Sequence, residues 1–180
     1  MKKFNYDTSK YKFREMVQDM FAVSDLSLLH SDRKDLHPNA TLEFDNESKT
    51  KYHQEFYKKM NQHWPELSSA YNLFIKNEVG KIIKEDFIYQ YMPTFRVHLP
   101  NDKAIHKWHY DSDPAHMHPN WEINFQIALT DMYGTQATWV EVVPGVKHYV
   151  PMEMTYGEFF VFNGNKCMHG NKENVTNKTR

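Results

Sequence analysis

The sequence predicts an α+β protein, an antiparallel β-sandwich or barrel with N-terminal helices packed on one side. Two observations carry this prediction. Apolar residues recur at helical spacing in residues 1–86, whereas residues 87–180 contain short aromatic and β-branched runs separated by turn-forming residues. The sequence has no internal repeat and no Gly/Ser-rich linker, so residues 1–180 are expected to form a single domain.

Three apolar stripes predict the helices of the first part. The first comprises Phe13, Val17, Met20 and Phe21, the second Tyr52, Phe56 and Met60, and the third Leu67, Tyr71, Phe74 and Ile75. Pro65 fits the first turn of the third helix, because a proline there has no backbone N–H to lose. Residues 24–46 are mixed and polar, and are expected to form a loop with short pieces of structure.

Five runs predict strands in the second part. They are residues 87–98, 107–111, 122–130, 137–143 and 158–162. Pro93 places the first run at a sheet edge or a bulge, because proline lacks the N–H that a central strand donates. Pro144-Gly145 and Asn163-Gly164-Asn165 are turn sequences that separate later strands.

The bulk composition argues against several classes of protein. A net charge of −1 over 180 residues gives no electrostatic basis for binding nucleic acid. The apolar stretches are too short to cross a bilayer, and no apolar run follows the N-terminus as in a secretory signal. The single cysteine, Cys167, excludes a disulfide within the chain and fits a cytoplasmic protein. The expected partner is a small-molecule substrate, and nothing in the sequence favours one oligomeric state.

One pair of residues in the second part indicates a metal site. His109 and Asp111 lie two positions apart in an aromatic strand, so their side chains point to the same face. His169 follows the buried run 158–162 and the next turn, and would come from a different strand. Two histidines and one carboxylate form the ligand set of non-haem Fe(II) oxygenases, which leaves coordination positions open.

The His-x-Asp pattern alone is weak, because His30-Ser31-Asp32 has the same form. That second copy lies in a polar stretch of the helical part with no strand pattern around it. The strand context therefore favours His109 and Asp111 as ligands. The structural alternative for them is a polar pair at a strand end that is hydrogen-bonded to the backbone.

Arg180 adds weight to the metal site. The chain has only four arginines among 22 basic residues. A guanidinium binds a carboxylate through two parallel hydrogen bonds, which a lysine cannot do. Arg180 is therefore the candidate group for the distal carboxylate of a 2-oxo dicarboxylic acid whose other end chelates the metal.

These motifs resemble those of the iron(II)/2-oxoglutarate-dependent oxygenase superfamily, on its phytanoyl-CoA hydroxylase-like side, and most of all the oxygenases named after a streptomycin-biosynthesis protein. The matching stretches are Phe95–Pro100, Trp108–Asp113, Val143–Gly145 and Gly157–Arg180. The resemblance implies a double-stranded β-helix, or jelly roll, over residues 87–180, and hydroxylation of an unactivated C–H bond with release of succinate and CO2. It implies Fe(II) bound by His109, Asp111 and His169, and 2-oxoglutarate paired with Arg180. In that fold such an arginine opens the last strand, so the core is expected to lack that strand here.

Further polar and aromatic residues are candidates for binding. Asn124 and Gln126 alternate with apolar residues, and would contact the 2-oxo acid or the substrate if they point inward, or solvent if they point outward. Trp139, one strand later, is a candidate substrate contact with the same ambiguity. Arg96 would either pair with an anionic substrate or form a structural ion pair.

Several alternatives remain open at this point. His106, His116 and His118 could form a second, zinc site, although a loop over the mouth of the first site is the more ordinary interpretation. Cys167 is expected to be a small buried apolar group rather than a metal ligand. The protein could instead be a non-catalytic jelly-roll domain that binds a metal or ligand, or a cupin-like metalloenzyme that does not use 2-oxoglutarate. Arg180 argues against the last of these.

Overall fold

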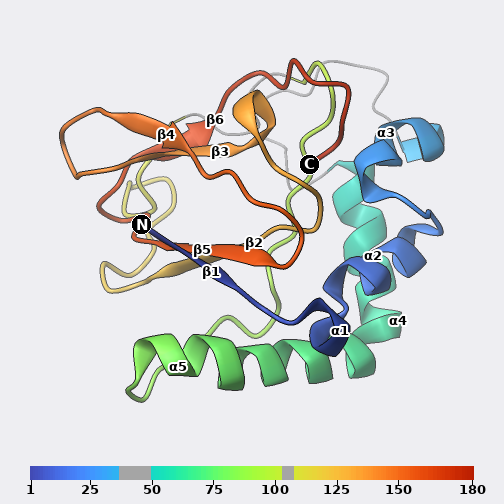
Figure 1. The fold of residues 1–180 in the computed structure, drawn as a ribbon, viewed down its shortest axis with the longest axis horizontal. Helices are drawn as coiled ribbons and strands as arrows, with labels where there is room; N and C mark the ends of the chain where they lie inside the picture. Colours follow the sequence, from blue (N-terminus) through green and yellow to red (C-terminus); the bar gives the residue numbers. More distant parts are fainter. Residues whose placement is uncertain (37–49, 103–107) are drawn as a thin grey trace.

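A computed structural model describes residues 1–36, 50–102 and 108–180, and it combines helices with two three-stranded antiparallel sheets (Figure 1). The first sheet has the order β1 (Lys2–Asn5), β5 (Glu158–Phe162), β2 (Asn124–Ile127). The second has the order β4 (Tyr149–Pro151), β3 (Thr138–Glu141), β6 (His169–Asn171). These described strands do not close into a barrel.

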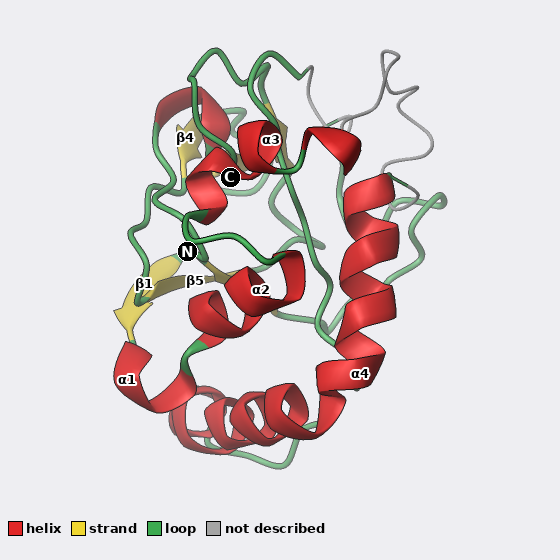
Figure 2. Cartoon of the chain, turned by 90° about the vertical axis from the view of Figure 1, so that its right-hand side faces the viewer, coloured by secondary structure: helices red, strands yellow, loops and turns green. Residues whose placement is uncertain are grey.

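The first sheet is a middle layer between the helices and the second sheet. Successive residues of a strand point to opposite faces, and β5 shows this alternation in its packing. Phe159 belongs to the apolar cluster formed by the helices. Phe160 and Phe162 belong to a second cluster that includes Val140 of β3 and Met152, which follows β4. The interior between the two sheets is therefore apolar at its centre, and the helices cover the outer face of the first sheet (Figures 1 and 2).

The helical layer is formed by the N-terminal part of the chain, as the sequence predicts. Its elements are α1 (Thr8–Tyr11), α2 (Phe13–Phe21), a 3-10 turn (Leu26–Leu28), α3 (Leu29–Asp32), a 3-10 turn (Lys34–Leu36), α4 (Lys51–Phe74), a π-helical segment (Ile75–Val79) and α5 (Gly80–Ile83). A further 3-10 turn, Gly134–Gln136, precedes β3. No helix in these described ranges is both long and apolar enough to cross a bilayer.

The prediction that a separate helix starts at Pro65 is wrong, because α4 runs through this residue as one helix of 24 residues. The second and third apolar stripes form one continuous stripe, since Met60 and Leu67 are seven residues, or about two turns, apart. Burial of that stripe outweighs the backbone hydrogen bond that Pro65 cannot donate. Figures 1 and 2 show the helix changing direction along its length, which is the usual effect of an internal proline.

The strand predictions differ from the structure mainly in length. Residues 158–162 form β5 as predicted, while β2 and β3 are shorter than the predicted runs 122–130 and 137–143. Residues 87–98 form no strand. At the end of this segment, His98 and Arg180 exchange two backbone hydrogen bonds of 2.8 and 2.9 Å. In the predicted run 107–111, His109 forms an isolated bridge with His169, and residue 107 lies outside the described residues.

Candidate metal centre

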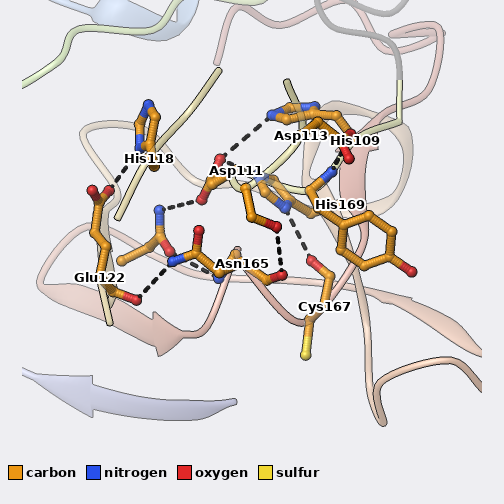
Figure 3. Close-up of polar contacts among 12 residues, drawn as sticks. His109, Asp111, Asp113, His118, Glu122, Asn165, Cys167 and His169 are labelled. Atoms are coloured by element: carbon orange, nitrogen blue, oxygen red, sulfur yellow. Dashed lines mark hydrogen bonds and ion pairs between the residues drawn. The ribbon is translucent and has the colours of Figure 1, made fainter. Parts of the chain in front are cut away.

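The structure brings His109, Asp111 and His169 together, with one possible ligand atom from each lying within 4.8 Å of the others (Figure 3). The Nε2 atoms of His109 and His169 lie 3.6 and 3.4 Å from Oδ1 of Asp111. The side chains of His109, His169 and Asp111 are 13, 10 and 9% exposed, respectively. Two imidazole nitrogens and a carboxylate oxygen thus converge on one nearly enclosed point, as the sequence predicts.

Backbone pairing explains how residues sixty positions apart meet. His109 and His169 exchange two backbone hydrogen bonds of 3.0 Å, and Asp111 donates its N–H to the carbonyl of Gly164 at 3.0 Å. His169 lies opposite Val140 in the second sheet, so both side chains point to the same face. That face is the one turned to the first sheet, since the ring centroids of His169 and Phe162 are 5.3 Å apart. The site therefore lies between the two sheets.

Neighbouring polar groups orient the ligands. The Nδ1 of His169 lies 3.1 Å from the carbonyl oxygen of Cys167, which can only accept, so Nδ1 carries the hydrogen and Nε2 is the basic nitrogen of the neutral ring. The amide of Asn124 donates to Oδ2 of Asp111 at 2.9 Å. The backbone N–H of Gly164 in turn donates to Oδ1 of Asn124 at 2.9 Å.

Gly164 allows this close approach because it has no side chain. A Cβ at this position would lie 1.9 Å from Oδ2 of Asp111 and 2.8 Å from Oδ1 of Asn124. Real Cβ atoms do not approach other atoms within 3.0 Å. The turn that the sequence shows as Asn163-Gly164-Asn165 is therefore a part of the site and more than a connection between strands.

The carboxyl group of Asp111 is held in its ionised form. Burial alone would raise its pKa, but the adjacent imidazoles of His109 and His169, together with the hydrogen bond from Asn124, hold the pKa well below its usual range. A buried anion flanked by two imidazoles is an arrangement that favours a cation at the point where the three ligand atoms converge.

A second polar group lies further along the same interior. The guanidinium Nη1 of Arg180 donates to Oγ1 of Thr138 at 2.8 Å, and Nε2 of Gln126 donates to the same oxygen at 3.0 Å. Thr138 lies two residues before Val140 on β3, so it shares the inner face with His169. Asn124 and Gln126 are likewise two residues apart on the inner face of β2. Of the predicted binding residues, Asn124, Gln126 and Arg180 thus all face the interior between the sheets.

The structure does not bring the other two predicted binding residues to this interior. Trp139 points to the opposite face of the second sheet, where its indole N–H donates to the carbonyl of Gly134 at 3.1 Å and Nζ of Lys172 lies 3.2 Å from the ring centroid. Register decides this outcome, because Trp139 alternates with the inward Thr138. Arg96 is exposed and donates to the carbonyl of Phe95 at 3.2 Å. It lines a cavity of about 30 Å³ that Arg180 also borders.

The other described histidines that the sequence offered as ligands do not join the first site. His30 and Asp32 belong to no group of possible metal ligands among the described residues, and Nδ1 of His30 lies 2.8 Å from Oγ1 of Thr179. His106 lies outside the described residues. The ring of His116 lies against that of His109, with centroids 4.3 Å apart and planes tilted by 39°.

Sequence reasoning missed two groups near the site. One is Glu122, whose carboxylate accepts from Nδ1 of His118 at 2.9 Å. The other is the carbonyl of Cys167, whose contact with His169 depends on the turn conformation and leaves no mark in the sequence.

The fold and the site together define a protein with a nearly buried two-histidine, one-carboxylate centre between two antiparallel sheets. Over 179 residues the chain is 32% identical to the streptomycin biosynthesis protein StrG of Streptomyces griseus, a match that covers 99% of this chain and 79% of that protein. The chain belongs to the family of StrG. No family model matches the sequence.

Proposed function

We propose that the protein is an Fe(II)/2-oxoglutarate-dependent oxygenase that hydroxylates an unactivated C–H bond of a small-molecule metabolite, with release of succinate and CO2. The observation that carries this proposal is the convergence of Nε2 of His109, Nε2 of His169 and Oδ1 of Asp111. The name of its relative, a biosynthesis protein, supports a role in small-molecule metabolism. The two facing sheets are consistent with the jelly roll that we propose for this fold.

The donor set fits a divalent iron. Two neutral imidazoles and one carboxylate on one side of an ion form the facial arrangement used by non-haem Fe(II) oxygenases. Asp111 accepts a hydrogen bond from Asn124, and His169 donates one to the carbonyl of Cys167; such contacts from outside the ligand set fix the orientation of metal ligands. When bound, iron supplies the activation of dioxygen that is coupled to oxidative decarboxylation of the co-substrate.

The position of Arg180 fits the distal carboxylate of 2-oxoglutarate. Asn124 contacts the ligand Asp111, while Gln126 contacts Thr138, to which Arg180 is bonded. Two residues of a strand span about 6.8 Å, which is comparable to the length of a five-carbon diacid. Arg180 and the hydroxyl of Thr138 would hold the distal carboxylate, and the 2-oxo acid end would reach the centre near Asp111.

The chain's own residues bind and position the reactants rather than transfer protons. The low pKa of Asp111 keeps a negative ligand at the centre throughout the physiological range. The apolar cluster around Val140, Phe160 and Phe162 excludes bulk water from one side of the interior. No side-chain general base is required for removal of a hydrogen from an unactivated C–H bond.

The experiment that tests the proposal needs no knowledge of the substrate. Metal-free protein is mixed anaerobically with Fe(II) and 2-oxoglutarate, and the visible metal-to-ligand charge-transfer band of the chelate is recorded. The proposal predicts a saturable band in the parent and none in His109→Ala. If the parent shows no band, the proposal fails. If the band forms but no succinate appears on admission of oxygen with a panel of metabolites, a non-catalytic binding domain is favoured instead.

A further inference from the structure

We propose that Asp111, His118 and Glu122 form a second divalent-cation site, next to the first and sharing Asp111 with it. One possible ligand atom from each of these three residues lies within 4.8 Å of the others. An imidazole with two carboxylates is a donor set that suits several divalent ions, among them Mn²⁺ and Zn²⁺. The inference goes beyond the proposed function and depends on it only through the shared Asp111.

Asp111 is suited to bridge two ions because its two oxygens face different neighbours. Oδ1 lies near the imidazoles of His109 and His169, whereas Oδ2 accepts from Asn124. Figure 3 shows His118 and Glu122 on one side of Asp111, and His109 and His169 on the other. Paired metal ions in proteins typically lie about 3.5–4 Å apart, a spacing that a bridging carboxylate allows.

The local charge favours a cation at this second position. Asp111 and Glu122 bring two carboxylates together, and like charges at this separation repel. Within residues 1–36, 50–102 and 108–180, no lysine or arginine forms an ion pair with either carboxylate. The imidazoles of His109, His118 and His169 and the neutral amide of Asn124 contact these carboxylates. A bound divalent ion would relieve this repulsion, whereas a neutral imidazole does so only weakly.

The loop that carries His118 and Glu122 is held in place by the site itself. The N–H of His118 donates to the carbonyl of Asp111 at 3.0 Å, and the N–H of Glu122 donates to the carbonyl of Pro119 at 2.9 Å. The buried amide of Asn165 donates to the carbonyls of Pro119 and Glu122, at 2.9 and 3.2 Å. Both side chains are thus presented from a fixed turn, which lowers the conformational entropy lost on binding an ion.

The two sites should differ in accessibility. The side chains of His118 and Glu122 are 44 and 34% exposed, in contrast to the nearly buried His109 and His169. A partly exposed site keeps more water ligands and exchanges its ion more readily. We therefore expect the second ion to bind more weakly than the first. The competing interpretation is that the hydrogen bond between His118 and Glu122 only closes the loop.

The test counts bound ions in metal-free protein. The parent, His118→Ala, Glu122→Gln and His109→Ala are titrated with Mn²⁺, with bound ions counted by calorimetry and by electron paramagnetic resonance. Glu66→Gln, an exposed carboxylate variant on α4, is the matched control. We expect two ions with magnetically coupled signals in the parent and in Glu66→Gln. We expect a single uncoupled ion in each of the three site variants.

The outcomes separate this inference from the proposed function. If the parent binds one ion that is lost in His109→Ala and kept in Glu122→Gln and His118→Ala, the second site is refuted and the first stands. If the parent binds one ion that is kept in His109→Ala and lost in Glu122→Gln, the paired arrangement is refuted and so is the proposed iron centre. Thermal unfolding of every variant checks that lost binding does not reflect lost folding.

Discussion

Replacement of Gly164 by alanine should damage the metal centre without removing any ligand. The new Cβ would lie 1.9 Å from Oδ2 of Asp111, so the carboxylate would have to retreat by about 1 Å to reach the 3.0 Å that real Cβ atoms keep. The same atom would press on Oδ1 of Asn124, starting from 2.8 Å. Both ends of the hydrogen bond that orients Asp111 are therefore displaced.

The expected magnitude follows from comparable changes in other proteins. Overpacking of a filled interior costs about 1–3 kcal/mol of stability. Disturbing a group that orients a metal ligand lowers metal affinity about 10- to 100-fold. We expect Gly164→Ala to lose affinity for the first metal ion within this range, with a lower Tm and an unchanged far-ultraviolet circular dichroism spectrum.

The assay is a calorimetric titration of metal-free parent and variant with Fe(II) under anaerobic conditions. Gly80→Ala is the matched control, because a Cβ on this helical glycine meets one atom at an ordinary 3.7 Å. This control should bind metal like the parent. A parent-like metal affinity in Gly164→Ala would refute the packing argument, because it would mean that Asp111 and Asn124 can move without consequence for the site.

Three further predictions follow from other parts of the structure. Arg180→Lys should raise the Kd for 2-oxoglutarate about 10- to 100-fold through loss of a bidentate charged contact, while the affinity for Fe(II) stays within about twofold. A titration of the charge-transfer band measures the Kd for 2-oxoglutarate, and calorimetry measures the affinity for Fe(II). An unchanged Kd for 2-oxoglutarate would contradict the role assigned to Arg180. Asp111 has a pKa lowered on folding, so in the metal-free protein its ionised form contributes stability above its unfolded pKa of about 3.9 and loses this contribution as the pH falls through the folded value. The difference in unfolding free energy between parent and Asp111→Asn should therefore decrease as the pH falls below about 5, as measured by urea denaturation. A difference that grows as the pH falls below this value would contradict the sign. Pro65→Ala should raise the free energy of unfolding by about 1–3 kcal/mol, because alanine restores a hydrogen bond inside α4, and a lower urea midpoint would show that the proline is required for the direction of the helix.

The ligand set was predictable because each member has a local cause. His109 and Asp111 share a face through the period of two along an extended chain, and His169 follows a run that forms β5 with the predicted bounds. The reciprocal backbone bonds between His109 and His169, together with the bond from Asp111 to Gly164, supply the long-range step. Asn124 and Gln126 could be placed on one face together, although the sequence could not say which face that would be.

The predictions that failed depended on contacts between distant segments. Pro65 marks a helix start by local rules, but burial of the continuous stripe through Met60 and Leu67 outweighs them. β1 was missed because Lys2 and Lys3 give it no strand pattern; it is ordered by pairing with β5. Trp139 faces away from the site because of the register of β3.

The polar groups around the metal centre could not be predicted from the sequence either. Two contacts bring Glu122 near Asp111. The amide of Asn165, more than forty residues away along the chain, holds the turn at Pro119, and the N–H of His118 donates to the carbonyl of Asp111. Gly164 looks like an ordinary turn glycine in the sequence. Its contact with Asp111 and Asn124 requires that two further segments meet at the same point.

The central claim is that His109, Asp111 and His169 hold one catalytic metal ion with 2-oxoglutarate beside it. The most direct measurement is anomalous X-ray diffraction from crystals grown anaerobically with Fe(II) and 2-oxoglutarate. The account predicts an anomalous peak about 2.1 Å from Nε2 of both histidines and from a carboxylate oxygen of Asp111, with the distal carboxylate of the co-substrate on Arg180. The absence of an iron peak at these three ligands, or a co-substrate that does not reach Arg180, would contradict it.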